Sequence, residues 1–249
     1  MVLAHGFGGS ARNWRPQIRA LKDTHRVIAY DARGHARSPA PEDPSSYTPE
    51  ALMGDLAGVL EAYAGGEPAV VVGLSLGAGI ALRFALQAPG RLRGLVLMAP
   101  PPGRDPTVRG GWAREFADAI ERDGLDAAGE CYAWGGRSGL DPAAGRLVRQ
   151  GFLEHPPHAL VHILRQVLDR WPCVEQQQPA LRTLRVPTLL LVGERDGLSL
   201  EMAKRLAREI PAARLEIAPG AGHVVNLAAR ELVNALLSGF LGELDPARR

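Results

Sequence analysis

One serine, one aspartate and one histidine have neighbours that suit nucleophilic catalysis. Ser75 is the centre of Gly-Leu-Ser-Leu-Gly, Asp196 follows the apolar run LLLVG, and His223 ends the glycine-rich stretch APGAGH. A serine hydroxyl is a weak nucleophile, so it needs a base to take its proton and a third group to orient that base. We therefore predict Ser75 as the nucleophile, His223 as the base and Asp196 as the orienting acid.

The same chemistry needs hydrogen-bond donors for the negative oxygen of a tetrahedral intermediate. The stretch AHGFGGS near the start of the chain can bring backbone amides close to a substrate because it is rich in glycine. We expect the backbone N–H groups of Phe7 and Leu76 to act as this pair of donors. His5 is an alternative base, but a packing role beside so tight a loop is the simpler interpretation.

A second group of polar residues, His155, His158 and His162, resembles a set of metal ligands. Helical spacing would place His158 and His162 on one face. However, two prolines interrupt the run, and neither a cysteine nor a clear supporting carboxylate accompanies it. We expect no metal site here and no cofactor.

The stretch GLSLGAG superficially resembles a phosphate-binding loop, but it lacks the lysine that such a loop needs.

Short apolar runs must position the catalytic candidates. Most of these runs are apolar at consecutive positions, which is typical of strands covered on both faces. They alternate with helix signals, and this alternation predicts an α/β protein with a mostly parallel sheet and helices on both faces. Ligands of such sheets bind at the carboxyl ends of the strands. The runs span residues 1–5, 26–31, 69–75, 94–99, 187–193 and 213–218.

Two of the intervening helices have recognisable ends. Thr48 and Pro49 are typical of a helix start, and Gly65 of a helix end. Later in the chain, Ser199 is expected to cap a helix that Pro211 terminates.

The alternation stops between residues 101 and 184. This segment combines helical patterns with many aromatic residues, which argues against a disordered linker. We predict a core domain of residues 1–100 and 185–249, with residues 101–184 inserted as a helical cap over the strand ends. The aromatic residues of the insertion are Trp112, Phe116, Tyr132, Trp134, Phe152 and Trp171.

Charge and composition exclude several classes of function. The 29 basic and 27 acidic side chains of the 249 residues give a net charge of +2, without a run of like charges, so we expect neither nucleic-acid nor membrane binding. The start of the chain does not resemble a secretion signal, and no apolar stretch is long enough to span a membrane. Cys131 and Cys173 are predicted to be free thiols, and a cytoplasmic location is expected.

Five stretches together resemble the α/β-hydrolase family, and specifically its small cap-bearing serine hydrolases: HGFGGSARNW, YDARGHARS, GLSLG, LLLVGERD and PGAGH. The resemblance implies the α/β-hydrolase fold with a helical cap. It also implies the roles given above to Ser75, His223 and Asp196, with Asp196 preferred over Glu194 as the acid. By the same resemblance, the amides of Phe7 and Leu76 form the oxyanion hole.

The sequence departs from the family pattern in two places. Ala36 replaces a glycine that usually follows the turn at residues 31–35, a turn that is mostly structural in the family. The antiparallel hairpin that usually precedes the first strand is apparently absent. Residues 26–31 would then form an unpaired sheet edge, which invites association with a second chain. We expect either such self-association or an N-terminally shortened form of a longer protein.

Within the family, the residue types at Ser75 and Val224 narrow the range of expected activities. Epoxide hydrolases and haloalkane dehalogenases carry aspartate at the position of Ser75, and hydrolases of ring-cleavage products tend to have tryptophan at the position of Val224. The nearest resemblance is to carboxylesterases and to lactone hydrolases similar to 3-oxoadipate enol-lactonase. We predict hydrolysis of a small-molecule ester or lactone through an acyl-enzyme. Acyl transfer, cofactor-free perhydrolysis and a ligand receptor with little turnover remain alternatives.

Overall fold

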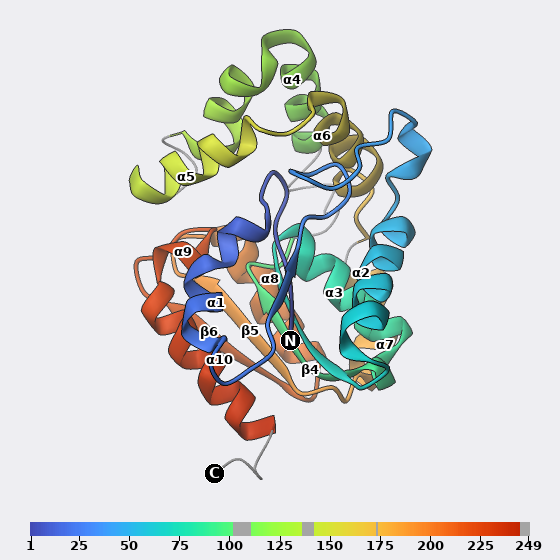
Figure 1. Cartoon of the computed structure of the whole chain (residues 1–249), viewed down its shortest axis with the longest axis vertical. Coiled ribbons are helices and arrows are strands. Elements are labelled where there is room, and N and C mark those ends of the chain that lie inside the picture. The colour runs from blue at the N-terminus through green and yellow to red at the C-terminus, as the bar shows by residue number, and fades with distance from the viewer. Residues whose placement is uncertain (102–110, 136–141, 173, 245–249) are drawn as a thin grey trace.

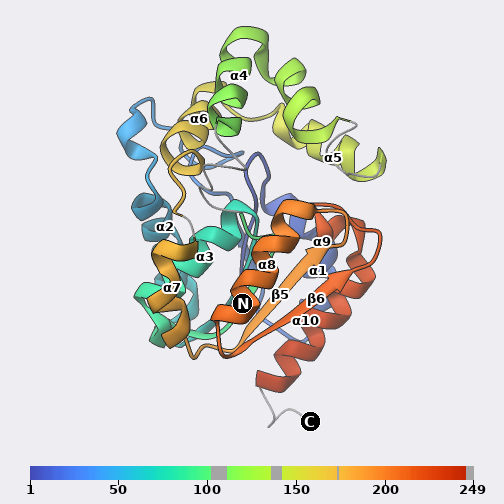
Figure 2. The same cartoon turned by 180° about the vertical axis from the view of Figure 1, so that it is seen from behind.

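A computed structural model describes residues 1–101, 111–135, 142–172 and 174–244 of the chain. In these residues, every strand belongs to one parallel sheet with the order β2-β1-β3-β4-β5-β6 (Figures 1 and 2). Each predicted apolar run contains or overlaps one strand, so the expected α/β fold class is confirmed. The strands are β1 (Val2–Ala4), β2 (Ile28–Tyr30), β3 (Ala69–Leu74), β4 (Leu92–Met98), β5 (Thr188–Gly193) and β6 (Ala213–Ala218).

The central strand β3 shows why its sequence reads as a continuous apolar run. Val71 belongs to the hydrophobic cluster on one face of the sheet, whereas Val70 and Val72 belong to the cluster on the other. Successive side chains of a strand point to opposite faces, so a strand covered on both sides needs apolar residues throughout. Burying one such side chain contributes about 1.5 to 3 kcal/mol.

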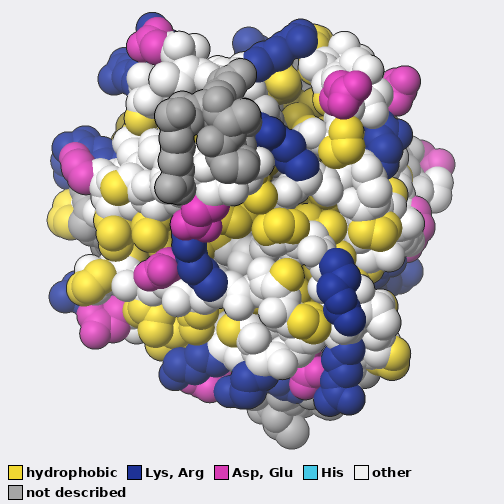
Figure 3. Space-filling view, turned by 90° about the horizontal axis from the view of Figure 1, so that it is seen from below, with side chains coloured by type: hydrophobic (Ala, Val, Ile, Leu, Met, Phe, Trp, Pro, Cys, Tyr) yellow, Lys and Arg dark blue, Asp and Glu magenta, His cyan; other side chains and the backbone are white. Residues whose placement is uncertain are grey.

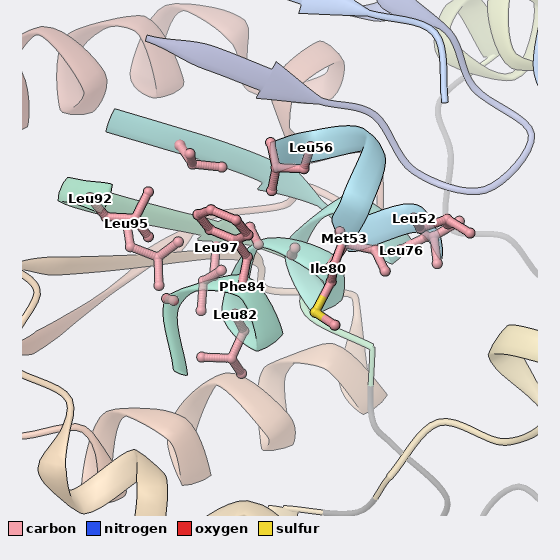
Figure 4. Packing of buried hydrophobic residues seen from close by; sticks show 14 of the residues in the cluster. Leu52, Met53, Leu56, Leu76, Ile80, Leu82, Phe84, Leu92, Leu95 and Leu97 are labelled. Carbon is pink, nitrogen blue, oxygen red and sulfur yellow. The ribbon is translucent and has the colours of Figure 1, made fainter. Parts of the chain in front are cut away.

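Helices cover both faces of the sheet (Figures 1 and 2). One face packs against α1 (Arg15–Leu21), α9 (Val225–Ala228) and α10 (Arg230–Leu244). The opposite face packs against α2 (Pro49–Ala64), α3 (Leu76–Gln87) and α8 (Gly197–Glu209). Figure 4 shows leucines of α2 and β4 and the Phe84 ring of α3 meeting in this second cluster.

The predicted ends of α2 are confirmed, but the predicted start of α8 is wrong. The Thr48 hydroxyl oxygen accepts a hydrogen bond from the Ala51 amide at 3.1 Å, and Gly65 ends α2 with a φ of 62°. The N-cap of α8 is Asp196, and Ser199 lies buried inside the first helical turn. Serine and aspartate share the preference for N-caps, so the sequence signal alone did not separate them.

Three helices lie over the carboxyl ends of the strands: α4 (Trp112–Gly129), α5 (Pro142–Phe152) and α6 (Pro157–Ile163) (Figure 1). They have their own hydrophobic cluster, and π-helical segments follow α4 and α6 at Glu130–Trp134 and Leu164–Leu168. Helix α7 (Val174–Thr183) packs instead against α8. We call α4 to α6 with the two π-helical segments the cap. The domain boundaries at residues 101 and 184 stay a prediction.

Strand β2 lies at the edge of the sheet, where the sequence analysis placed residues 26–31. It pairs with β1 on one side only, and the amino group of Met1 donates a hydrogen bond to the Arg26 carbonyl oxygen at 2.7 Å. Association of this edge with a second chain stays a prediction.

The described surface carries mixed charge. Figure 3 shows one face of the molecule, on which basic and acidic side chains are interspersed around hydrophobic ones. None of the described helices is long and apolar enough to cross a lipid bilayer. Cys131 is exposed, whereas Cys173 lies outside the described residues, so the predicted pair of free thiols is untested.

Ala36 occupies a backbone conformation that favours glycine, with a φ of 44°. A left-handed conformation costs a non-glycine residue about 1 to 2 kcal/mol, while glycine costs about 0.5 to 1 kcal/mol in lost chain entropy. We therefore predict that Ala36→Gly raises the free energy of unfolding by about 0.5 to 1 kcal/mol, measured by urea denaturation. The control Ala40→Gly, in the same loop without a positive φ, should lower it. A loss of stability in Ala36→Gly would contradict the prediction.

Candidate active site

Ser75 lies at a sharp turn between β3 and α3. Its φ of 52° and ψ of −115° are strained for a residue with a side chain. The flanking glycines make the turn possible, because a β-carbon at Gly73 would lie 2.3 Å from the Gly77 carbonyl oxygen, and one at Gly77 would lie 2.3 Å from the Ala4 carbonyl oxygen. The turn therefore presents the serine hydroxyl at the carboxyl end of the sheet.

The structure brings the three predicted catalytic side chains into one hydrogen-bonded chain. His223 Nε2 lies 3.0 Å from Ser75 Oγ, and His223 Nδ1 lies 2.6 Å from Asp196 Oδ2. A carboxylate accepts and does not donate, so Nδ1 carries the ring proton and Nε2 is free to accept the serine proton. Three segments far apart in the sequence supply this arrangement.

Asp196 is held in its ionised form. Burial opposes ionisation, but the hydrogen bond from His223 and the charge of that ring, with a further contribution from the neighbouring Ser199, outweigh it and lower the pKa of the Asp196 carboxyl. Ser199, which the sequence analysis assigned to a helix cap, thus supports the acid of the site. The sequence did contain a signal for this proximity, because a serine stands three residues after the aspartate. Whether that serine caps a helix or lies beside Asp196 depends on where the helix begins.

Glu194, the alternative acid, and His5, the alternative base, are not part of this hydrogen-bonded chain. The Glu194 carboxylate accepts a hydrogen bond from the Gly220 amide at 2.8 Å. The His5 ring is buried, with Nδ1 donating to the Gly6 carbonyl oxygen at 2.8 Å and Nε2 accepting from the Ala32 amide at 2.9 Å. Both ring nitrogens of His5 are therefore engaged with the backbone, which agrees with the packing role expected for it.

The loop after β1 forms a tight turn beside Ser75. The Gly9 amide donates to the Gly6 carbonyl oxygen at 3.0 Å, and Gly8 has a φ of 67°. We call residues 6–9 the Gly6–Gly9 turn. Among the described residues, no hydrogen-bond acceptor takes the Phe7 amide. Leu76 is the first residue of α3, where backbone amides have no partner within the helix. These are the two donors predicted from the sequence.

A second buried imidazole supports the same turn. His35 Nε2 accepts a hydrogen bond from the Gly8 amide at 3.1 Å, so this nitrogen carries no proton, and Nδ1 donates to the Arg33 carbonyl oxygen at 3.1 Å. The ring of His35 packs edge-on against that of His5, with centroids 4.9 Å apart. The role of His35 was missed, because nothing in the sequence indicates which loop the ring contacts.

The three cap histidines do not converge on one point. The Nε2 atom of His155 lies 2.9 Å from the Gly9 carbonyl oxygen, that of His158 lies 3.2 Å from the Ala40 carbonyl oxygen, and that of His162 lies 3.1 Å from the Glu42 carbonyl oxygen. Within the described residues, no group of three potential ligands is placed to hold a metal ion. Each ring instead connects the cap to a loop of the core.

A cavity of about 280 Å³ lies between Ser75 and the cap. Its walls are mainly aromatic and aliphatic, and the two π-helical segments contribute Tyr132 and Leu168. No lysine or arginine of the described residues lines it. The apolar lining consists of Phe7, Pro101, Trp112, Phe116, Tyr132, Ala133, Val148, Phe152, Leu168, Leu198 and Val224.

A much smaller cavity, of about 60 Å³, adjoins the first at Ser75 and His223. It lies against the Gly6–Gly9 turn and Asn13. The serine hydroxyl therefore faces a large apolar cavity on one side and a small cavity on the other. A larger and more open hollow of about 570 Å³ lies along α2 and β2, where Arg33 is already paired with Asp55, and it does not include Ser75.

Comparison with known proteins agrees with this geometry. The model of a family described as "Alpha/beta hydrolase family" matches residues 1–236. The chain belongs to the alpha/beta hydrolase family. A putative carbamate hydrolase RutD of Azorhizobium caulinodans is 32% identical to this hydrolase over 98% of the chain and 92% of the relative.

Two solved structures resemble this alpha/beta hydrolase closely. A thermophilic esterase from Thermogutta terrifontis has a TM-score of 0.85 and 28% identity, over 98% of this chain and 89% of the other. The enol-lactonase from Burkholderia xenovorans LB400 has a TM-score of 0.82 and 25% identity, over 96% and 90%. The predicted membership of the α/β-hydrolase family is thereby confirmed, and the chain is a hydrolase of that fold.

We predict that acidification destabilises the fold through its buried histidines. Burial lowers the pKa of His5 to about 4, and burial also lowers the pKa values of His35 and His155. Unfolded histidines bind protons below about pH 6.5 while these remain neutral, so the free energy of unfolding falls as the pH drops from 6.5 toward 4. His5 alone accounts for about 3 kcal/mol over this interval.

Urea denaturation at pH values from 7.5 to 4.5 measures this effect. The free energy of unfolding should be nearly constant at the upper end and should decrease progressively below about pH 6.5. An unfolding free energy that stays constant down to pH 5 would show that the buried rings titrate as they do in the unfolded chain.

Proposed function

We propose that this alpha/beta hydrolase cleaves carboxylic esters or lactones, with Ser75 as the nucleophile. The observation that carries the proposal is the hydrogen-bonded chain from Asp196 through His223 to Ser75, located at the strained turn after β3. The similarity to an esterase and to an enol-lactonase supports the same class of substrate. Neither cofactor nor metal is needed for this chemistry.

The reaction proceeds in two halves. Ser75 Oγ attacks the carbonyl carbon while His223 Nε2 takes its proton, and the amides of Phe7 and Leu76 stabilise the negative oxygen. The tetrahedral intermediate collapses to an acyl-enzyme, and His223 returns the proton to the leaving alcohol. Water then attacks the acyl carbon, His223 takes its proton, and the acid is released with Ser75 restored. Throughout, Asp196 stabilises the charged imidazole.

The shape of the site favours an uncharged substrate with one bulky apolar group. The 280 Å³ cavity is lined mainly by apolar side chains and, among the described residues, by no basic side chain that would pair with a carboxylate of the substrate. The 60 Å³ cavity on the other side accommodates only a small group. An ester that joins a bulky aryl or alkyl group to a short partner fits both.

Carbamate hydrolysis is a second candidate, favoured by the 32% identity to a putative carbamate hydrolase. The same serine attack applies to a carbamate carbonyl. Acyl transfer and perhydrolysis on the same residues, and a receptor with little turnover, are further alternatives that the product analysis below separates.

We predict that the purified protein hydrolyses uncharged aryl or alkyl esters or lactones, and that Ser75→Ala lowers kcat by about 10⁴-fold or more. The panel contains esters of varied acyl and alcohol length, lactones and carbamates. Ser45→Ala, which replaces an exposed serine outside both cavities, is the matched control and should retain full activity. A serine-directed phosphonate should label Ser75, detected by mass spectrometry.

Several results would contradict this assignment. Equal activity of the wild type and Ser75→Ala would place the chemistry elsewhere, and a phosphonate adduct retained by Ser75→Ala would exclude Ser75 as the labelled residue. Binding without turnover would indicate a receptor. Products formed mainly with an added alcohol or peroxide, at the expense of the acid, would indicate acyl transfer or perhydrolysis.

A further inference from the structure

His155 is a cap residue with an unusual position beside the active-site loop. It precedes α6, is only 3% exposed, and directs Nε2 at the Gly9 carbonyl oxygen, 2.9 Å away. A carbonyl oxygen only accepts, so Nε2 carries the proton and Nδ1 does not. Nδ1 is buried without a hydrogen-bond partner in the described structure. An unpaired buried acceptor costs about 1 to 3 kcal/mol, which an apolar residue at this position would avoid.

The bond from His155 completes the set of contacts that hold the Gly6–Gly9 turn. His5 and the Gly9 amide donate to the Gly6 carbonyl oxygen, and the Gly8 amide donates to His35. His155 holds the Gly9 carbonyl, while no described residue accepts a hydrogen bond from the backbone amide of Phe7. The Phe7 N–H belongs to the same planar peptide group as the Gly6 carbonyl, so the bonds from His5 and from the Gly9 amide set its direction. His155 acts on this peptide group through Gly9, whose carbonyl it holds.

Phe152 of the cap packs against the same Gly6–Gly9 turn. A β-carbon at Gly8 would lie only 2.3 Å from Cδ2 of the Phe152 ring, so the ring rests directly on the glycine backbone. The ring of His155 stacks on Phe152 with centroids 6.4 Å apart, and it meets the ring of His35 edge-on at 5.1 Å. Contacts from the cap and from the core thus converge on Gly8 and Gly9.

We propose that His155 is a positioning residue of the reaction, which couples the docking of the cap to the orientation of the Phe7 amide in the oxyanion hole. The proposal rests on the proposed function, because it assigns the Phe7 amide to the oxyanion. When the cap is docked, the Nε2–H of His155 holds the Gly9 carbonyl and the turn presents its donor toward Ser75. Without that bond, the cavity walls remain, but Gly9 is held less firmly, and the peptide group that carries the Phe7 N–H is less well fixed because the Gly9 amide is one of its two anchors.

His158, in the first turn of α6, provides a matched control three residues further along the chain. Its ring also donates Nε2–H to a carbonyl oxygen of the core, that of Ala40, but this acceptor lies in a different loop, and His158 lines neither active-site cavity. A general contribution of cap docking to stability would be shared by His155 and His158. An effect on the oxyanion hole would belong to His155 alone.

The test uses two amides that differ in reach. In His155→Gln the side-chain nitrogen reaches the position of Nε2, whereas in His155→Asn it stops near Nδ1 and cannot donate to Gly9. We expect His155→Asn to lower kcat about 10- to 100-fold with KM changed less than three-fold, because a misdirected donor weakens the transition state more than the substrate complex. His155→Gln should recover most of the activity, and His158→Asn should retain it. Melting temperatures report the folding of each variant.

Hydrogen exchange gives a readout that does not depend on turnover. Peptides that cover residues 6–11 should exchange faster in His155→Asn than in the wild type, and should be restored in His155→Gln. Equal kcat and equal exchange in the two His155 variants, or the same losses in His158→Asn, would overturn the proposal even if Ser75 is the nucleophile. If the wild type turns over no substrate, the proposed function fails, and unchanged exchange in His155→Asn would then independently refute the coupling to the turn.

Discussion

The reversed backbone at Ser75 is the constraint on which the rest of the site depends. A φ of 52° at a serine is tolerated only because β3 is fixed between β1 and β4 and because both flanking glycines leave room for neighbouring backbone. The apolar residues that bury β3 on both faces therefore support the candidate site, since they hold the strand against the strain of the turn. Asp196 and His223 need only reach the same edge from β5 and β6.

Around this rigid point, the remaining parts of the site are held by backbone contacts. Neutral imidazoles suit this task because each ring offers one donor and one acceptor at fixed angles, and burial keeps the rings of His5, His35 and His155 uncharged. The ionised Asp196 contrasts with them, since hydrogen bonds stabilise its charge despite burial. The site therefore combines one fixed charge with a largely neutral frame.

The sequence predicted the strands and the three side chains that the structure joins in one hydrogen-bonded chain, because both leave local signals. Consecutive apolar residues mark buried strands, and glycine-rich turns after β3 and β6 mark the positions of Ser75 and His223. It did not predict the true cap of α8, because Asp196 and Ser199 have the same local preference. It also missed the role of His155, whose partner Gly9 is 146 residues away and is chosen by the packing of the cap.

The contact between Phe152 and Gly8 means that the cap and the Gly6–Gly9 turn have to evolve together. Because the ring occupies the space that any side chain at Gly8 would fill, a side chain at Gly8 would require a smaller residue in place of Phe152, so the two positions are coupled. A cap grafted from a relative would fit this core only if it supplied a ring of similar depth, and a loop grafted alone would meet a foreign surface. Tyr132 and Leu168 also line the cavity, but neither side chain fills the space beside Gly8, so substrate range can diversify at these two positions while the contact between Phe152 and Gly8 is kept.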